Sequence, residues 1–416
     1  MPGLRAGPLR LARGRRARAR RLPRGPGVRP RILFVDQSGA PGGGELSLLE
    51  IAKHCRAACD VVLLSDGPFR ALLEEAAVPV TVVPAPPAFI GIARERGGVR
   101  DLRALAAILT LARRLARLAE GHDLIYANTQ KAMIVAALAG RLTRKPVIWH
   151  LRDILSGDHF GRAQRWAAVR LANAWISRVI ANSTATAEAF VTAGGDRARV
   201  TVVYNGIDAS AFGPISDERR MRLRADLGLG REPLVAAFGR LSPWKGQHVL
   251  IDALPRLPGV HALIVGAALY GEDAYADELR RQVTALDLAD RVHFLGFRKD
   301  VFDLMSLASV VVHTAVAPEP FGRVLVEGML AQRPVVASRA GGAVEIIEDG
   351  TSGVLVAPND AHALAQALAD LLGDESRGRR IAANGYERAC RHFSLGAMLA
   401  KIEREVDSVL ARNPRP

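Results

Sequence analysis

Glu319-Pro-Phe-Gly-Arg-Val-Leu-Val-Glu327 places two carboxylates on either side of a Pro-Phe-Gly turn, and the apolar stretch Ser309-Val-Val-Val-His313 leads into it. This order predicts a strand, a loop that holds Glu319, and a helix that holds Glu327. A helix N-terminus offers unpaired backbone N–H groups and a positive dipole end, and both favour an anion such as phosphate. Carboxylates accept hydrogen bonds from hydroxyls, the groups that sugars and ribose carry. The stretch therefore predicts a site for a phosphate flanked by hydroxyls, as in a nucleotide sugar.

Three other segments carry related patterns: Phe238-Gly-Arg-Leu-Ser-Pro-Trp-Lys-Gly246, the glycine-rich Ala340-Gly-Gly-Ala-Val-Glu-Ile-Ile-Glu-Asp-Gly-Thr-Ser-Gly353, and Val203-Tyr-Asn-Gly-Ile-Asp208. Together with the paired glutamates, and in this order, they resemble the signature segments of the retaining glycosyltransferases of family 4, also described as glycosyl transferases group 1. The resemblance covers about residues 31–395. It implies a GT-B fold, in which two Rossmann-like domains face each other across an interdomain cleft.

Apolar strands alternate with helical segments from Arg31 onward, which is typical of an α/β protein with parallel sheets covered on both faces. We predict an Arg-rich disordered tail over 1–30, an N-terminal acceptor-side Rossmann-like domain over 31–204, a linker over 205–232, a C-terminal nucleotide-sugar-binding Rossmann-like domain over 233–392, and a C-terminal helix over 393–416. The resemblance implies that this helix crosses back to the first domain.

Composition agrees with two domains, because 416 residues exceed the usual size of one domain and 49% of them are hydrophobic. The formal charge of +15 is concentrated at one end: residues 1–30 hold ten arginines and no acidic residue. This segment lacks periodicity and an apolar run, so we expect a solvated tail and no secretory signal. A tether to anionic lipid or to nucleic acid is the alternative, and nucleic acid is the less favoured partner.

The three cysteines (Cys55, Cys59 and Cys390) give no disulfide framework, which predicts a reducing cytoplasm. Cys55 and Cys59 are expected on one helix as small buried hydrophobes. No run of about 18 apolar residues suggests a membrane span. The expected location is the cytoplasm, and binding to the inner face of the membrane is a further option.

The strongest candidate residues lie in the second half. Arg240 and Lys245 follow an apolar strand, where their charges suit the phosphate oxygens of a leaving group. The resemblance implies that both bind the donor diphosphate, that Glu319 faces the donor sugar or the reacting centre, and that Glu327 binds the ribose hydroxyls. The amides of Phe321 and Gly322 are expected to bind the distal phosphate.

Further candidates are weaker. The loop Gly42-Gly-Gly-Glu45 follows the first strand, and the resemblance brings Gly42, Gly43 and Gly44 against the donor diphosphate. His150 ends a strand and is expected to contact the donor sugar and join Glu319, Arg240 and Lys245 as a catalytic group, with a buried core histidine as the alternative. Asn128 is a candidate for binding acceptor hydroxyls, and Arg298 is expected either near the nucleotide base or on the surface.

No Asp-x-Asp sequence occurs in the chain, so the common metal–diphosphate device is missing and the cations would neutralise the leaving group instead. We therefore expect no metal and no cofactor, only the nucleotide-diphosphate sugar as substrate. The resemblance implies retention of configuration. We prefer a front-face substitution in which the leaving phosphate helps to deprotonate the acceptor.

Residues 101–118 predict a basic amphipathic helix, with arginines at 103, 113, 114 and 117. Such a helix suits an anionic membrane, where lipid-linked acceptors reside, although a core helix with one wet face gives the same pattern. Arg162, Arg165, Trp166 and Arg170 would extend the basic patch.

These observations favour a retaining glycosyltransferase that moves a sugar from a nucleotide-diphosphate sugar to a hydroxyl of a glycan, a glycolipid or a small molecule. The alternatives are a sugar-nucleotide epimerase or an NAD(P)-dependent oxidoreductase on a related fold, and a non-catalytic binding protein. The oxidoreductase arises because Gly42 and Gly44 nearly complete a dinucleotide fingerprint, with Ser47 in place of its third glycine.

Overall fold

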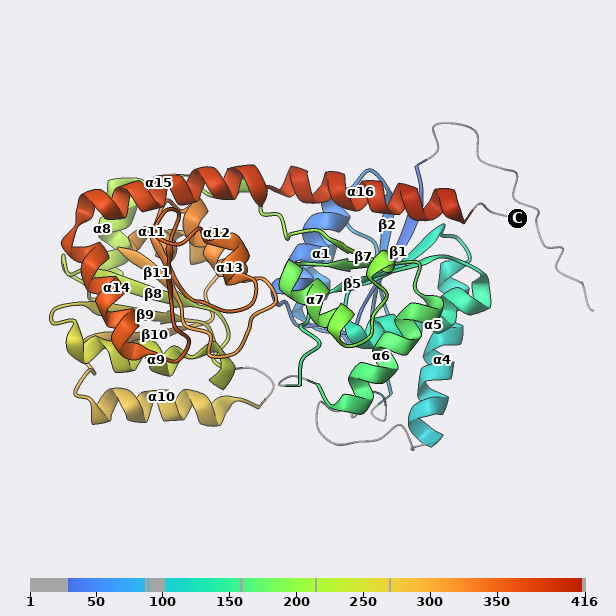
Figure 1. Ribbon diagram of the computed structural model, residues 1–416, viewed down its shortest axis with the longest axis horizontal. Coiled ribbons are helices and arrows are strands. Elements are labelled where there is room, and N and C mark those ends of the chain that lie inside the picture. Colours follow the sequence, from blue (N-terminus) through green and yellow to red (C-terminus); the bar gives the residue numbers. More distant parts are fainter. Residues whose placement is uncertain are drawn as a thin grey trace, which may run out of the picture.

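The structure is a computed structural model that describes residues 29–86, 89, 102–157, 160–213, 215–268 and 271–413. Two parallel sheets, each flanked by helices, lie side by side (Figure 1). The predicted tail lies outside the described residues except for its last two positions.

The first sheet has the strand order β3-β2-β1-β4-β5-β6-β7, and every pairing is parallel. Its strands are β1 (Arg31–Asp36), β2 (Ala58–Leu63), β3 (Val80–Val82), β4 (Leu124–Ala127), β5 (Val147–Leu151), β6 (Arg178–Ala181) and β7 (Val200–Val202). Its helices are α1 (Gly43–His54), α2 (Pro68–Glu75), α4 (Leu102–Ala119), α5 (Gln130–Thr143), α6 (Arg162–Trp175) and α7 (Thr184–Thr192). The strand order reverses between β1 and β4, which is where ligands bind in open parallel sheets.

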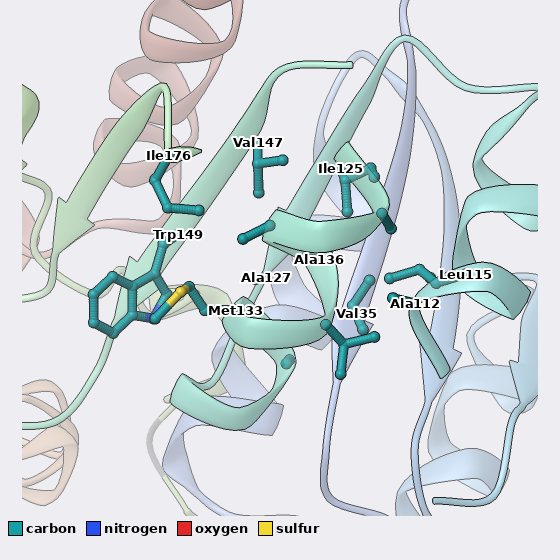
Figure 2. Packing of buried hydrophobic residues seen from close by; sticks show 14 of the residues in the cluster. Val35, Ala112, Leu115, Ile125, Ala127, Met133, Ala136, Val147, Trp149 and Ile176 are labelled. Atoms are coloured by element: carbon teal, nitrogen blue, oxygen red, sulfur yellow. The ribbon is translucent and has the colours of Figure 1, made fainter. Parts of the chain in front are cut away.

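Alanines bring α5 close to the first sheet. Ala132, Ala136 and Ala139 are fully buried, and α5 is flanked by α4 and α6 on the same face. Trp149 of β5 fills the space beside Met133 (Figure 2). Small side chains on the helix and large ones on the strands give the dense packing that a core needs.

The second sheet repeats this architecture with the order β10-β9-β8-β11-β12-β13. Its strands are β8 (Leu234–Phe238), β9 (His261–Val265), β10 (Val292–Gly296), β11 (Val310–His313), β12 (Val335–Ser338) and β13 (Val354–Val356). Its helices are α8 (Asp217–Asp226), α9 (Gln247–Ala253), α10 (Asp273–Ala285), α11 (Val301–Leu307), α12 (Arg323–Leu330), α13 (Ala343–Ile346), α14 (Ala361–Gly373) and α15 (Glu375–His392). The order reverses between β8 and β11. The predicted α/β class with two Rossmann-like parallel-sheet domains is confirmed.

The last helix, α16 (Leu395–Arg412), follows α15 and lies along the first domain (Figure 1). Its buried face belongs to the core built on β1, β4 and β5 and consists of Leu395, Met398, Ile402, Val406 and Val409. Ion pairs accompany this packing: Arg56 with Glu403 at 2.7 Å and with Asp407 at 3.8 Å, and Arg178 with Glu405 at 2.8 Å.

The region expected to be a linker packs against the second domain. It contains α8, whose Leu223 is buried in the core of the second domain, and Arg219 pairs with Asp303 of α11 at 2.8 Å. The sequence of this region already showed a short helical pattern around 216–227, and α8 lies there. Its contact with α11 is what the sequence did not show.

The expected placement of Cys55 and Cys59 on one helix is wrong. Cys55 has an extended backbone (φ −69°, ψ 151°) and ends α1, while Cys59 is the second residue of β2. The chain turns directly from helix to strand, and the two half-buried thiols meet with their sulfurs 2.8 Å apart.

Candidate active site

Glu319 is the centre of a charged cluster in the loop between β11 and α12. Its Oε1 accepts a hydrogen bond from Lys245 Nζ at 2.7 Å, and its Oε2 bonds Nε2 of His313 at the end of β11. Burial alone would raise the pKa of this carboxyl, but Lys245 and His313 lower it well below its ordinary value. Glu319 is therefore held as a carboxylate that accepts hydrogen bonds and cannot donate a proton.

Arg240 and Lys245 both follow β8, at the carboxyl edge where the strand order reverses. Lys245 ends a short helical turn and lies over the ring of Trp244, with Nζ 4.4 Å from the ring centroid. Arg240 Nε lies 3.3 Å from Glu272 Oε2, and Ser242 donates to the other oxygen of Glu272 at 2.5 Å. Each cation is thus paired with a carboxylate.

The turn before α12 places the second glutamate. Gly322 caps the helix with φ 98°, a left-handed conformation that glycine adopts without strain. Phe321 is buried against Tyr204 and Phe393, which fixes the turn at the junction of the two domains. Glu327 follows one turn into α12, and Arg323 NH2 lies 3.1 Å from its Oε1.

The predicted glycine-rich turn packs against the backbone of the loop that holds Glu319. Gly341 has φ 58°, and a Cβ there would lie 2.2 Å from the carbonyl oxygen of Glu319. Gly342 donates its N–H to the same oxygen at 2.8 Å. The glycines thus permit the backbone contact that holds Glu319 in position.

The first domain contributes a buried polar network at its own reversal point. Asn128, after β4, donates to Asp36 at 2.6 Å and to the Gly44 carbonyl at 3.2 Å, and its Oδ1 accepts from Arg152 Nε at 2.7 Å. Arg152 also donates to Asn205 at 2.8 Å. Asn128 is fully buried and therefore positions Arg152 and the glycine loop. Its predicted contact with an acceptor hydroxyl stays a prediction.

His150 is fully buried within this network. Its Nδ1 lies 3.1 Å from Arg152 NH2 and 2.8 Å from the Tyr126 hydroxyl. Burial, followed by the charge of Arg152, lowers the pKa of His150 well below its ordinary value, so the ring is neutral. Because arginine only donates, Nδ1 accepts and the proton resides on Nε2. That nitrogen is buried and has no hydrogen-bond partner among the described residues.

Two carboxyls beside this network hold their protons unusually tightly. Burial raises the pKa of Asp36 to about 6, and burial together with the charge of Asp36 raises that of Glu45 to about 8. At these two carboxyls the folded protein therefore binds more protons than the unfolded chain from about pH 4 to pH 8. The contribution of these groups to the free energy of unfolding falls as the pH rises across that range.

Replacing Glu45 with glutamine tests this directly, because the amide oxygen can still accept the Gly42 N–H that Glu45 Oε2 accepts at 3.0 Å. We expect the variant to raise the melting temperature over wild type more at pH 8 than at pH 5. The exposed Glu278 on α10, changed to glutamine, is the control. An equal shift at both pH values would show that Glu45 is ionised in the folded protein.

The two domains contact each other through loops and helix ends that follow the carboxyl-terminal edges of their sheets. Glu345 of α13 accepts the backbone N–H groups of Thr184 and Ala185 at 2.7 and 2.8 Å, so a carboxylate of the second domain caps α7 of the first. A Cβ on Gly43 would lie 3.3 Å from Arg323 Cδ. The glycine loop of the first domain therefore adjoins the start of α12.

The structure thus gathers the sequence candidates into two groups. Arg240, Lys245, Glu319, Phe321, Gly322 and Glu327 surround the reversal point of the second sheet, and Gly42, Gly43, Gly44, Asn128 and His150 surround that of the first. Arg298 lies apart, after the edge strand β10, where it pairs with Asp300 at 2.5 Å. Its contact with a nucleotide base stays a prediction.

Sequence reasoning missed several members of the site: Asp36, Glu45, Arg152, Glu272, His313 and Arg323. A signal existed for some of them, because Asp36, Arg152 and His313 end or directly follow parallel strands next to a reversal point. No sequence pattern pointed to Glu272, which reaches Arg240 from the start of α10.

Comparisons with known proteins agree with this geometry. The family described as Glycosyltransferase Family 4 matches residues 41–211, and Glycosyl transferases group 1 matches residues 220–388. A GDP-mannose-dependent α-(1-6)-phosphatidylinositol monomannoside mannosyltransferase of Mycolicibacterium smegmatis is 31% identical, over 74% of this chain and 84% of its own. The chain belongs to glycosyltransferase family 4.

Other family 4 comparisons extend this result. A D-inositol 3-phosphate glycosyltransferase of M. smegmatis is 34% identical over 58% of this chain and 55% of its own, so the match spans about half of that relative. The crystal structure of Anabaena HepE in complex with UDP-glucose is 43% identical, with a TM-score of 0.84, over 91% of this chain and all of that one. The family assignment makes this protein a nucleotide-sugar-dependent glycosyltransferase with the GT-B fold, in preference to the epimerase, oxidoreductase and binding-protein alternatives.

Proposed function

We propose that this family 4 glycosyltransferase transfers glucose from UDP-glucose to a hydroxyl acceptor with retention of configuration. The observation that carries the proposal is the arrangement of Lys245, Glu319 and Glu327 around the start of α12, in a chain 43% identical to a protein crystallised with UDP-glucose. The cations after β8 would bind the diphosphate, and Glu327 would accept hydrogen bonds from the ribose hydroxyls.

The geometry supports defined roles for each group. Lys245 and Arg240 stabilise charge on the departing diphosphate, and electrostatic stabilisation of this kind usually contributes more to catalysis than any other single effect. Glu319, ionised and held by two partners, accepts hydroxyl hydrogen bonds at the sugar end. The Nε2–H of neutral His150 donates to a sugar oxygen. We propose that these cations, rather than a metal ion, neutralise the leaving diphosphate, since the chain holds no Asp-x-Asp sequence.

The donor is tested by isothermal titration of UDP-glucose, GDP-mannose, ADP-glucose and dTDP-glucose, each with and without EDTA. We expect UDP-glucose to bind most tightly and EDTA to have no effect. Preferential binding of GDP-mannose, the donor in the name of the mycobacterial relative, would replace the donor assignment. Nuclear magnetic resonance of the product tests retention, which requires an α-linked glucoside from the α-linked donor.

Replacing Glu327 with alanine is expected to weaken UDP-glucose binding about 10–100-fold. This is the loss of hydrogen bonds to a charged group, at about 1.5–3 kcal/mol. Titration measures it, and the exposed Glu278→Ala variant is the control. Unchanged affinity in Glu327→Ala would remove Glu327 from the donor site.

We further propose that the enzyme acts on a lipid-linked acceptor at a membrane surface. No helix within the described ranges has the length and hydropathy needed to cross a bilayer. On α4 the faces divide sharply: Leu111 and Leu115 are buried, whereas Leu105, Leu109 and three arginines (113, 114 and 117) are exposed. Asp101 and the side chain of Arg103 lie outside the described residues.

The neighbouring helix α6 adds to this surface. Trp166 is 64% exposed, and Arg170 lies over its ring at 5.6 Å. Both helices flank α5 on the same face of the first domain (Figure 1). Arginines beside exposed apolar groups suit the boundary of an anionic bilayer.

Co-sedimentation with phosphatidylglycerol vesicles tests this surface. The triple variant Arg113→Glu, Arg114→Glu, Arg117→Glu is expected to lose binding, because each arginine near an anionic surface contributes about 1 kcal/mol. The matched control reverses two exposed arginines on α15, Arg379 and Arg380, and should bind as wild type does. Equal binding by the triple variant would exclude α4 as the membrane contact.

A further inference from the structure

Arg323 stands at a position where a cation is unfavourable without an anionic partner. It is the first residue of α12, whose first turn holds no acidic side chain. The positive end of a helix dipole repels a cation there. Its described ion pair is with Glu327, one turn later in the same helix, at 3.1 Å. The side chain is 16% exposed, and its NH1 nitrogen is buried with no hydrogen-bond partner among the described residues.

The aliphatic part of the Arg323 side chain also lies beside the first domain. A Cβ on Gly43 would lie 3.3 Å from Arg323 Cδ, and one on Gly44 would lie 3.0 Å from Arg152 Cδ. The two glycines thus pass between two arginines, one from each domain. Burial lowers the pKa of Arg152 to about 10, and the charge of Arg323 contributes to that lowering. The arrangement brings two arginine side chains to a glycine loop, beside the carboxyls of Asp36 and Glu45.

We propose that Arg323 is a third diphosphate-binding cation. When the nucleotide sugar binds, the Arg323 guanidinium exchanges its partner Glu327 for the donor phosphates. This inference rests on the proposed function and assigns a further residue to the same site. The diphosphate supplies the anion that the start of α12 and the unpartnered NH1 both lack. Glu327 loses its internal partner at the same moment and becomes free to accept the ribose hydroxyls. Donor binding is thereby an exchange of ion pairs, which avoids leaving either group buried and unpaired.

The exchange also couples the donor to the first domain. An anion bound between Arg323 and the glycine loop reduces the repulsion between Arg323 and Arg152 across Gly43 and Gly44. Lys245 with Glu319 and Arg240 with Glu272 are arranged in the same way, each cation held by a carboxylate before the donor arrives.

The test compares UDP with uridine, which lacks the phosphates, by titration against wild type, Arg323→Gln and Arg323→Lys. We expect Arg323→Gln to weaken UDP binding about 10–100-fold, the loss of charge-assisted hydrogen bonds, and to change uridine binding less than twofold. Arg323→Lys should recover part of the affinity for UDP because it keeps the charge. Arg222→Gln, on the exposed face of α8, is the matched control. Melting temperatures without ligand verify that the variants are folded.

Three outcomes would overturn the inference. Wild-type UDP affinity in Arg323→Gln would show that the guanidinium does not contact the phosphates. Equal losses for UDP and uridine would show that Arg323 only holds Glu327 in place. In either case wild type still binds UDP, so the proposed function stands and only the role of Arg323 fails. If wild type binds no nucleoside diphosphate, the proposed function fails together with the role of Arg323.

Discussion

Replacing Lys245 with alanine is expected to lower kcat about 10²–10³-fold, the usual cost of removing one preorganised charge from around a transition state. Lys245 Nζ lies 2.7 Å from Glu319 and follows the strand at which the second sheet reverses its order. Its charge would be needed most as the bond to the diphosphate breaks, so we expect kcat to fall more than the affinity for donor. Steady-state kinetics with UDP-glucose separates the two effects.

Two comparisons sharpen this prediction. Lys53 forms an ordinary surface pair with Glu50 at 3.5 Å, and its alanine variant should keep wild-type rates. If Lys245 acts only by keeping Glu319 ionised, the lost rate would return as the pH is raised, because Glu319 would ionise again without help. A loss that persists at all pH values would assign the charge of Lys245 to the reaction itself, and kcat within threefold of wild type would exclude both roles.

The second large effect is expected from Gly341→Ala. The residue has φ 58°, and an added Cβ would lie 2.2 Å from the Glu319 carbonyl oxygen, so the loop must move. Backbone strain costs about 1–2 kcal/mol and the forced displacement about 1–3 kcal/mol more. We expect both the strain and the displacement to lower the free energy of unfolding of the second domain. We also expect kcat to fall, because the displaced loop holds Glu319.

Gly350 provides the matched control for that variant. It has φ 73°, close to that of Gly341, but a Cβ there would meet nothing within 4 Å. Gly350→Ala should therefore show only the strain, about 1–2 kcal/mol in the free energy of unfolding, with unchanged kcat. Denaturant unfolding and steady-state kinetics on both variants measure the difference. Equal changes in unfolding free energy and kcat for the two variants would mean that the Glu319 loop can move away from the added Cβ without losing stability or activity.

The sequence predicted best those parts of the site that lie within one strand–loop–helix unit. Glu319 and Glu327 could be placed on loop and helix because the apolar run of β11, the Pro-Phe-Gly turn and the helical pattern follow one another directly. The same holds for Arg240 and Lys245 after β8. The order of neighbouring sequence patterns is enough to place site residues when they all belong to one continuous segment.

The remaining parts depend on contacts between distant segments. Arg152 gains its role by reaching Asn128 and Asn205, and Glu272 reaches Arg240 from another helix. Arg323 lies inside the most informative stretch, yet its burial, its pairing with Glu327 and the approach of Gly43 from the other domain appear only in the fold. The helical pattern of α8 was visible in the sequence, but its contact with α11 was not, because α11 lies far along the chain.

The path of α16 has a consequence for how the protein matures on the ribosome. The first domain is translated early, yet part of its core comes from a helix that follows the whole second domain in the chain. Domains ordinarily fold as units during synthesis, N-terminal first. Here the face of the first sheet that α16 covers stays open to solvent until translation has passed residue 409. Until then we expect that apolar surface to stay exposed, so the first domain completes its core only after the second domain has been synthesised.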